Sequence, residues 1–191
     1  MNKIKIERKW AMPNKWTFQI KPISRFLDEE MTDGLWIDPF AGTSKLAKIT
    51  NDINPEMNTD FHLDATDFLK TFETESVDGV LFDPPYSSEQ IKRSYDNAGI
   101  ETMGLGNITQ SSFYSRPKIE ISRIVKPNGK VLSFGWNSNG IGKSRGFRID
   151  RILLVPHGGN HLDTICVSEI KLQCRLSSFS ITKRMEAGES G

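Results

Sequence analysis

A carboxylate, two prolines and a phenol ring follow one another at Asp83-Pro84-Pro85-Tyr86, directly after the apolar segment 77–82. That segment has the length and composition of a strand buried on both faces. Each proline fixes its own φ at about −65° and donates no hydrogen bond to a sheet, so the pair forms a rigid corner at the strand's exit. An ordinary turn explains neither the acid nor the aromatic ring. The segment therefore predicts a fixed hydrogen-bond acceptor beside a stacking surface.

A second segment, Asp38-Pro39-Phe40-Ala41-Gly42-Thr43, lies between an expected strand at 35–38 and an expected helix at 44–48. Open α/β sheets bind ligands where strands end. Gly42 lets the backbone approach a ligand closely, and Thr43 and Ser44 can cap the following helix. Because glycine and hydroxyl residues are also common in loops, this segment alone is a weak indication of a ligand site.

Alternating strands and helices must position these two segments. The expected strands are 35–38, 49–52, 61–63, 77–83, 130–136, 149–156 and 164–172, and the expected helices are 17–31, 44–48, 65–71 and 112–125. This alternation predicts a parallel α/β sheet. The link 157–162 is too short for a crossover helix, so the last two strands should form an antiparallel hairpin at the sheet edge. Segment 87–111 lacks periodicity and predicts an irregular loop.

The chain has 191 residues, of which 37% are hydrophobic and 26% are charged, as expected for one folded domain. We expect that domain to span 1–182, with a frayed tail at 183–191. No apolar run approaches the roughly 18 residues of a membrane helix. Cys166 and Cys174 form no metal-type pair and predict a reducing cytosol. His157 and His161 flank two glycines, which favours a structural turn over a metal site, and we expect no metal.

The net charge of +1 hides an asymmetry. Residues 1–112 carry 12 Lys and Arg against 18 Asp and Glu, whereas residues 113–191 carry 13 against 6. Either this reflects ordinary solvated faces, or the second half presents a surface for a polyanion.

The two segments together resemble the amino-methyltransferases of the N6-adenine and N4-cytosine type. In that family a D-P-F-x-G segment contacts S-adenosylmethionine, and a D/N/S-P-P-Y/F segment holds the target base. The resemblance implies a class I methyltransferase fold (Rossmann-like), a seven-stranded, mostly parallel sheet with an antiparallel C-terminal hairpin. The strongest overall likeness is to small adenine-specific DNA methylases of phages and prophages, which share stretches like 136–140 and 157–161.

The resemblance assigns catalysis to Asp83, Pro84, Pro85 and Tyr86. The Asp83 carboxylate and the Pro84 carbonyl accept the hydrogens of the target amine, and Tyr86 stacks on the extruded base. The same resemblance predicts that S-adenosylmethionine binds Phe18, Lys21, Pro22, Asp38, Pro39, Phe40, Gly42, Thr43, Asp52, Asp64 and Ala65.

Several of these cofactor residues also have a purely structural interpretation. Asp52 can accept both ribose hydroxyls, or it is a surface turn acid. Asp38 can orient the methionine ammonium, or it caps a turn. Asp64 can meet the adenine, or it caps a helix. Phe18 can equally be a residue of the hydrophobic core, and Lys21 can equally belong to the cap of a helix.

Two regions are predicted to bind DNA. The loop 87–111 contributes Gln90, Lys92, Arg93 and Tyr95, and the glycine-rich stretch 136–148 contributes Asn137, Asn139, Lys143 and Arg145. A poorly ordered surface loop and a plain glycine-rich connection are the respective alternatives.

We therefore expect methyl transfer from S-adenosylmethionine to the N6 amine of adenine in DNA, by base flipping and direct displacement, in the cytoplasm or in a phage's host. The alternatives are RNA adenine or N4-cytosine DNA methylation, a glutamine methylase (which usually carries Asn at position 83), and a catalytically silent subunit of a DNA-modification complex. No large region remains for target recognition, so we expect DNA that is single-stranded or weakly specified in sequence, or help from homodimerisation.

Overall fold

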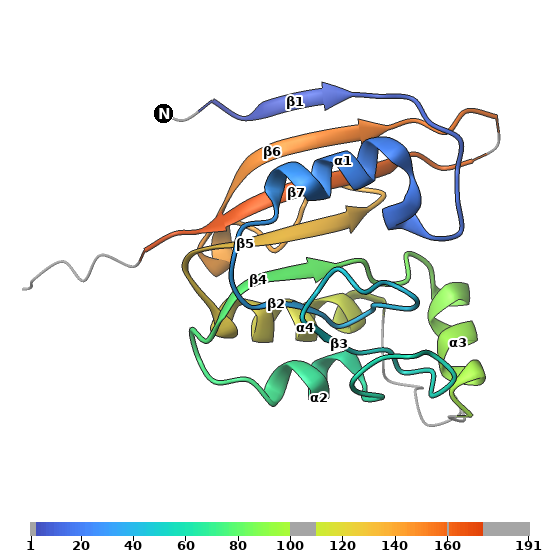
Figure 1. Ribbon diagram of the computed structural model, residues 1–191, viewed down its shortest axis with the longest axis vertical. Helices are drawn as coiled ribbons and strands as arrows, with labels where there is room; N and C mark the ends of the chain where they lie inside the picture. The colour runs from blue at the N-terminus through green and yellow to red at the C-terminus, as the bar shows by residue number, and fades with distance from the viewer. Residues whose placement is uncertain (1–2, 100–109, 160, 174–191) are drawn as a thin grey trace, which may run out of the picture.

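The computed structural model describes residues 3–99, 110–159 and 161–173, which form one sheet with helices on both faces (Figure 1). The seven strands are β1 (Lys5–Arg8), β2 (Trp36–Asp38), β3 (Ile49–Thr50), β4 (Val77–Phe82), β5 (Val125–Gly135), β6 (Phe147–Val155) and β7 (Thr164–Lys171). The helices are α1 (Lys21–Glu30), α2 (Ala65–Lys70), α3 (Ser88–Asn97) and α4 (Gln110–Ile124), with single 3₁₀ turns η1 (Thr17–Gln19) and η3 (Lys143–Arg145).

The strands lie in the order β1-β6-β7-β5-β4-β2-β3. Every neighbouring pair is parallel except the two pairs that include β7, which runs antiparallel to both β5 and β6. The predicted mostly parallel α/β sheet and the antiparallel β6–β7 hairpin are confirmed. The carboxyl ends of β2, β3 and β4 meet at one edge of the sheet, so the loops that follow them converge there.

An apolar layer covers each face of the sheet. Helix α1 lies over β6 and β7 in Figure 1 and buries Ile23, Phe26 and Leu27, which recur at the spacing of one helical face. Helices α2 and α4 bury Phe68 and Ile121 against the opposite face. Because both faces are covered, the central strand β4 is almost entirely apolar, and this rigid strand delivers Asp83 to the sheet edge.

One expected feature of the sheet edge is wrong. The hairpin does not lie at the edge, because β1 pairs with β6 in parallel and extends the sheet by one strand. The sequence Lys5-Ile-Glu-Arg8 was not predicted as a strand because charged residues dominate it. Arg151 fixes β1 in place, since its guanidinium donates a hydrogen bond to Glu7 (2.7 Å) and also pairs with Glu29 and Glu30 of α1.

Four other expected elements differ in the structure. Residues 61–63 form a single bridge between Phe61 and Asn51 rather than a strand, and residues 44–48 form no helix. The expected loop at 87–111 contains the helix α3, and the expected helix at 17–31 is a 3₁₀ turn followed by α1. The remainder of that loop at 100–109 and the expected tail at 183–191 lie outside the described residues.

The absence of a helix at 44–48 matters for the site. Strands β2 and β3 are joined by residues 39–48 alone, so the glycine segment crosses directly from one strand to the next. Asn51 orders this crossing, because its amide donates to the carbonyls of Pro39 and Leu63 (both 3.0 Å) and its oxygen accepts from the Leu63 amide (2.9 Å). Hydrogen bonds thus replace the packing that a helix would supply.

Candidate functional site

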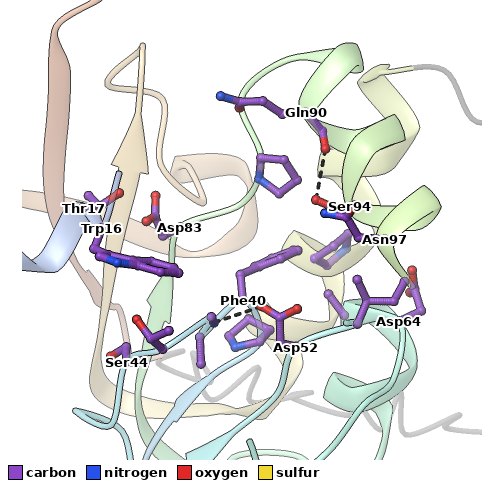
Figure 2. Close-up of a pocket in the computed structure, with 18 of the residues that line it drawn as sticks. Trp16, Thr17, Phe40, Ser44, Asp52, Asp64, Asp83, Gln90, Ser94 and Asn97 are labelled. Carbon is purple, nitrogen blue, oxygen red and sulfur yellow. Dashed lines mark hydrogen bonds between the residues drawn. The ribbon is translucent and has the colours of Figure 1, made fainter. Parts of the chain in front are cut away.

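A cavity of about 550 Å³ lies at the carboxyl ends of β2, β3 and β4, where the loops converge (Figure 2). Most of the residues that the sequence assigned to a cofactor line it, together with part of the catalytic corner. The predicted residues that line this cavity are Phe18, Pro39, Phe40, Gly42, Thr43, Asp52, Asp64, Ala65, Asp83, Pro85, Gln90, Arg93 and Tyr95.

Three predicted cofactor residues do not line the cavity. Lys21 is exposed and Pro22 half-buried at the first turn of α1, where they serve the start of the helix. Asp38 is fully buried behind the cavity wall. The predicted DNA residue Lys92 is exposed on α3 and lines neither this cavity nor the second one described below.

The corner at 83–86 is held by hydrogen bonds at three points. The Tyr86 hydroxyl donates to Asp83 Oδ1, and the Tyr86 amide donates to Gln90 Oε1 (2.7 Å). The Tyr114 hydroxyl of α4 donates to the Pro85 carbonyl (2.6 Å). With two prolines between the acid and the ring, these bonds leave the corner little freedom. The structure thus presents the rigid corner that the sequence predicts.

Asp83 lies against the N-terminal 3₁₀ turn, and Figure 2 shows its carboxylate beside Thr17. Burial raises the pKa of Asp83 to about 6, although hydrogen bonds from the Tyr86 and Thr17 hydroxyls act in the opposite direction. The carboxylate is therefore ionised at neutral pH and becomes protonated in mildly acidic solution. Only the ionised form offers all of its oxygen lone pairs to a donor.

Gly42 and Asp52 form one unit at the opposite wall of the cavity. Gly42 has a φ of 53°, in the left-handed region that favours glycine, and its amide donates to Asp52 Oδ2 (2.9 Å). The Asn54 amide donates to Asp52 Oδ1 (2.9 Å). A Cβ at position 42 would lie 3.3 Å from the Trp16 ring. The backbone thus fixes the Asp52 carboxylate at the cavity wall (Figure 2), with acceptor capacity left on both oxygens.

Asp64 caps a helix and also lines the cavity. Its Oδ1 accepts from the Thr66 amide (2.8 Å) at the start of α2, so the helix-cap interpretation is confirmed. Its Oδ2 accepts from the Tyr95 hydroxyl (2.7 Å), and the residue also lines the cavity. Tyr95 was assigned to DNA, but it is buried and lines this first cavity, because the segment forms the helix α3 and its hydroxyl reaches Asp64 at the start of α2.

Asp38 caps the turn after β2. Its Oδ1 accepts from the Phe40 amide (3.0 Å), whereas Oδ2 has no hydrogen-bond partner among the described residues. Burial raises the pKa of Asp38 well above its usual value, and the nearby charges of Asp83 and Asp52 add to that effect. Asp38, behind the cavity wall, therefore interacts electrostatically with Asp52 and Asp83, which both line the cavity.

We expect Asp38→Asn to stabilise the ligand-free protein above pH 7. The asparagine can still accept from Phe40, but it carries no charge to bury. Because the folded-state pKa of Asp38 is raised, wild-type stability is lost as the pH rises from about 4 through that pKa. The variant should unfold at a higher urea concentration than the wild type at pH 8 and at the same concentration at pH 4. An equal gain at both pH values would contradict this explanation.

Sequence reasoning missed several residues that line the first cavity. Trp16 faces it from the segment before α1, as Figure 2 shows, and Phe113 and Arg116 face it from α4. A tryptophan directly before the Thr17-Phe18 segment was the one available signal. The α4 residues carried none, because only the tertiary fold brings that helix to the sheet edge.

A second cavity of about 540 Å³ lies on the other side of the corner. It is lined by Pro84 and Tyr86 of the corner, by residues of α4 and β5, and by the stretch after β5. The predicted DNA residues Asn137, Asn139 and Arg145 line it, whereas Lys143 does not. The Tyr86 ring lies 5.6 Å from the ring of Trp136. The corner thus forms part of the wall of both cavities.

No family model and no curated protein matches this sequence. TrmN from Thermus thermophilus matches the structure with a TM-score of 0.54 at 16% identity, over 80% of this chain and 49% of that one. A 1,6-didemethyltoxoflavin-N1-methyltransferase from Burkholderia thailandensis, crystallised with 1,6-didemethyltoxoflavin and S-adenosylhomocysteine, matches with a TM-score of 0.53 at 13% identity, over 80% of this chain and 78% of that one. This chain thus matches about half of the TrmN chain.

These likenesses show the fold. The chain has the class I methyltransferase fold, in which β7 is inserted antiparallel between β5 and β6. Strand β1 continues the sheet beyond β6, and residues 39–48 join β2 to β3 without a helix. No helix in the described part of the chain is long and apolar enough to cross a membrane.

Proposed function

We propose that this protein is an S-adenosylmethionine-dependent methyltransferase that modifies the N6 amine of adenine in DNA. The observation that carries the proposal is the corner at 83–86 between two cavities. Asp83 and Pro85 line the first cavity, and Pro84 and Tyr86 line the second. A transfer between two bound molecules needs both reactants held next to one another, and two cavities that share the corner as part of their walls can hold them so.

The first cavity fits a nucleoside cofactor. Its volume of about 550 Å³ falls within the range of small-molecule sites. Asp52 can accept both hydroxyls of a ribose, and Leu63 and Ala65 offer an apolar surface to an adenine ring. One protein of the same fold was crystallised with S-adenosylhomocysteine. When bound, S-adenosylmethionine supplies an electrophilic methyl group on its sulfonium.

The corner residues supply the remaining chemistry. The exocyclic amine of adenine is a poor nucleophile because its lone pair is delocalised into the ring. An ionised Asp83 accepts one amine hydrogen, and the Pro84 carbonyl accepts the other, so the positive charge that grows on nitrogen is stabilised. One preorganised group of this kind contributes about 10²–10³ in rate. Hydrogen bonds from Thr17 and Tyr86 hold the Asp83 carboxylate in place in the ligand-free protein.

Tyr86 stacks on the extruded base in this proposal. Flipping a base costs a few kcal/mol, and one aromatic stacking contact returns about 1–3 kcal/mol. Tyr86→Ala should therefore weaken DNA capture by roughly tenfold or more, whereas Tyr86→Phe should retain most activity because stacking uses the ring. Fluorescence of a 2-aminopurine placed at the target position measures base extrusion directly. Equal loss in both variants would show that the hydroxyl contact to Asp83, and not stacking, is the role of Tyr86.

Transfer of label from tritiated S-adenosylmethionine tests the proposal. Purified protein is incubated separately with plasmid DNA, its single-stranded form, a matched RNA transcript and a protein mixture. Label should enter DNA, and Asp83→Ala should abolish it. Label in RNA alone would replace DNA by RNA as the substrate. Binding of S-adenosylhomocysteine without any transfer would instead identify a catalytically silent subunit.

A further inference from the structure

Within the part of the second half that the structure describes, most cations are already paired with carboxylates. Among the described residues, Arg123, Lys126, Lys130, Arg148, Arg151 and Lys171 each form an ion pair. Four of these six pairs reach acids of the first half, for example Lys130 to Glu30 (2.9 Å) and Lys171 to Glu75 (3.3 Å). Much of the charge asymmetry in the sequence is therefore neutralised within the fold.

Lys118 and Arg145 are the exceptions that share a cavity. Within the described ranges neither forms an ion pair, both are half-buried, and both line the second cavity. Arg145 is held in place, because it donates to the Ile141 carbonyl and to Ser115 Oγ (both 3.3 Å). Two like charges held together away from bulk water repel one another unless an anion lies between them.

The nearest buried acid does not supply that anion. Glu169 is fully buried, and its two oxygens accept from the backbone amides of Ile141 (2.5 Å) and Gly142 (3.0 Å). Glu169 thus fixes the loop that carries Arg145 and forms no ion pair with Lys118 or Arg145. Lys118 and Arg145 are thus the charged side chains among the described residues that line the cavity, while Glu169 acts on Lys118 only through its electrostatic attraction.

A buried hydroxyl and an exposed aromatic ring complete the second cavity. Ser133 is only 7% exposed, and its Oγ has no hydrogen-bond partner in the described part of the chain. A buried polar atom without a partner is uncommon in folded proteins and points to a missing ligand. Trp136 also lines this cavity, is 43% exposed, and its ring lies beside that of Tyr86. Two cations, a buried hydroxyl without a partner and a partly exposed aromatic ring match the phosphate, a polar atom and the base of a nucleotide.

We propose that the second cavity holds a nucleotide of the substrate strand, with Lys118 and Arg145 on a backbone phosphate, Ser133 on a polar atom of the same nucleotide, and Trp136 stacked on a base. This inference rests on the proposed function and deepens it, because it names a polynucleotide strand as the ligand of this cavity. Lys118 is then a positioning residue that fixes the strand relative to the corner at 83–86.

Binding of a fluorescein-labelled single-stranded oligonucleotide, followed by anisotropy from 50 to 300 mM NaCl, tests this inference. Lys118→Gln should weaken binding by about tenfold at low salt. It should also reduce the slope of log K against log salt by about 0.7, the contribution of one phosphate contact to a single strand. Lys118→Arg should restore both values. Lys70→Gln, which removes an exposed cation on α2 outside both cavities, is the matched control.

Two further measurements separate this inference from the proposed function. All these variants should bind S-adenosylhomocysteine as the wild type does, because Lys118 does not line the first cavity. Suppose that the wild type methylates DNA, and that Lys118→Gln binds the oligonucleotide with the same affinity and the same salt slope as the wild type. The inference is then wrong and the proposed function stands. If adenosine 5′-monophosphate competes with the oligonucleotide at equal molarity, the cavity serves a small anion and the strand assignment is overturned. Absence of any label transfer to DNA would remove the proposed function itself.

Discussion

Replacing Asp83 with alanine should lower kcat by at least about 100-fold while leaving the affinity for S-adenosylhomocysteine nearly unchanged. The acceptor for the amine is lost, but the cofactor contacts at Gly42 and Asp52 lie on another wall of the cavity. Single-turnover transfer of label measures the chemical step, and calorimetry measures cofactor binding. A parallel loss of both quantities would assign Asp83 to cofactor binding and contradict its role at the amine.

The pH profile provides the control for that substitution. Because burial raises the pKa of Asp83 to about 6, the wild-type rate should rise about tenfold per pH unit below 6 and level off above pH 7. The sign follows from the acceptor role, since the protonated acid no longer offers both oxygens to the amine. Asp83→Asn keeps the shape of the side chain and should give a low rate without this acidic limb. A limb that persists in Asp83→Asn would belong to another group.

Replacing Asp52 with alanine should weaken cofactor binding by about 100-fold. A charge-assisted hydrogen bond contributes about 1.5–3 kcal/mol, and this carboxylate is placed to accept from two hydroxyls while it also holds the Gly42 amide. Calorimetry with S-adenosylhomocysteine checks the loss, and Asp67→Ala, an exposed acid of α2 paired with Lys70, is the matched control.

An excess of cofactor distinguishes the role of Asp52 from that of the corner residues. With saturating cofactor the Asp52→Ala protein should recover most of its kcat, because the carboxylate acts on binding and not on the amine. A low kcat that excess cofactor does not restore would contradict the ribose assignment. A fall in melting temperature of several degrees would point instead to a structural role in the crossing from β2 to β3.

The sequence was most informative where local chemistry determined local structure. Two prolines after an apolar strand make a rigid corner in any context, and an acid before Ala65 caps a helix for the same local reason. The central strand β4 was predictable from its run of hydrophobic residues. The C-terminal hairpin was predictable from the short link between its two strands, β6 and β7.

The features that were missed depend on contacts far apart in the sequence. Strand β1 pairs with β6 and is held there by the contact of Arg151 with Glu7, two residues separated by most of the chain. Residues 44–48 form an irregular connection instead of the expected helix, and hydrogen bonds of Asn51 help to order the crossing that contains them. The residue type of Asn51 alone indicates only a turn. Lys118 resembled any lysine of an amphipathic helix, and only the second cavity distinguishes it.

The most direct test of the central claim is the identity of the methylated nucleoside. Plasmid DNA treated with the protein and S-adenosylmethionine is digested to nucleosides and analysed by mass spectrometry, with Asp83→Ala as the blank. The account predicts N6-methyldeoxyadenosine in the wild-type sample and none in the blank. Methylation confined to N4 of cytosine, or the same product in both samples, would contradict it.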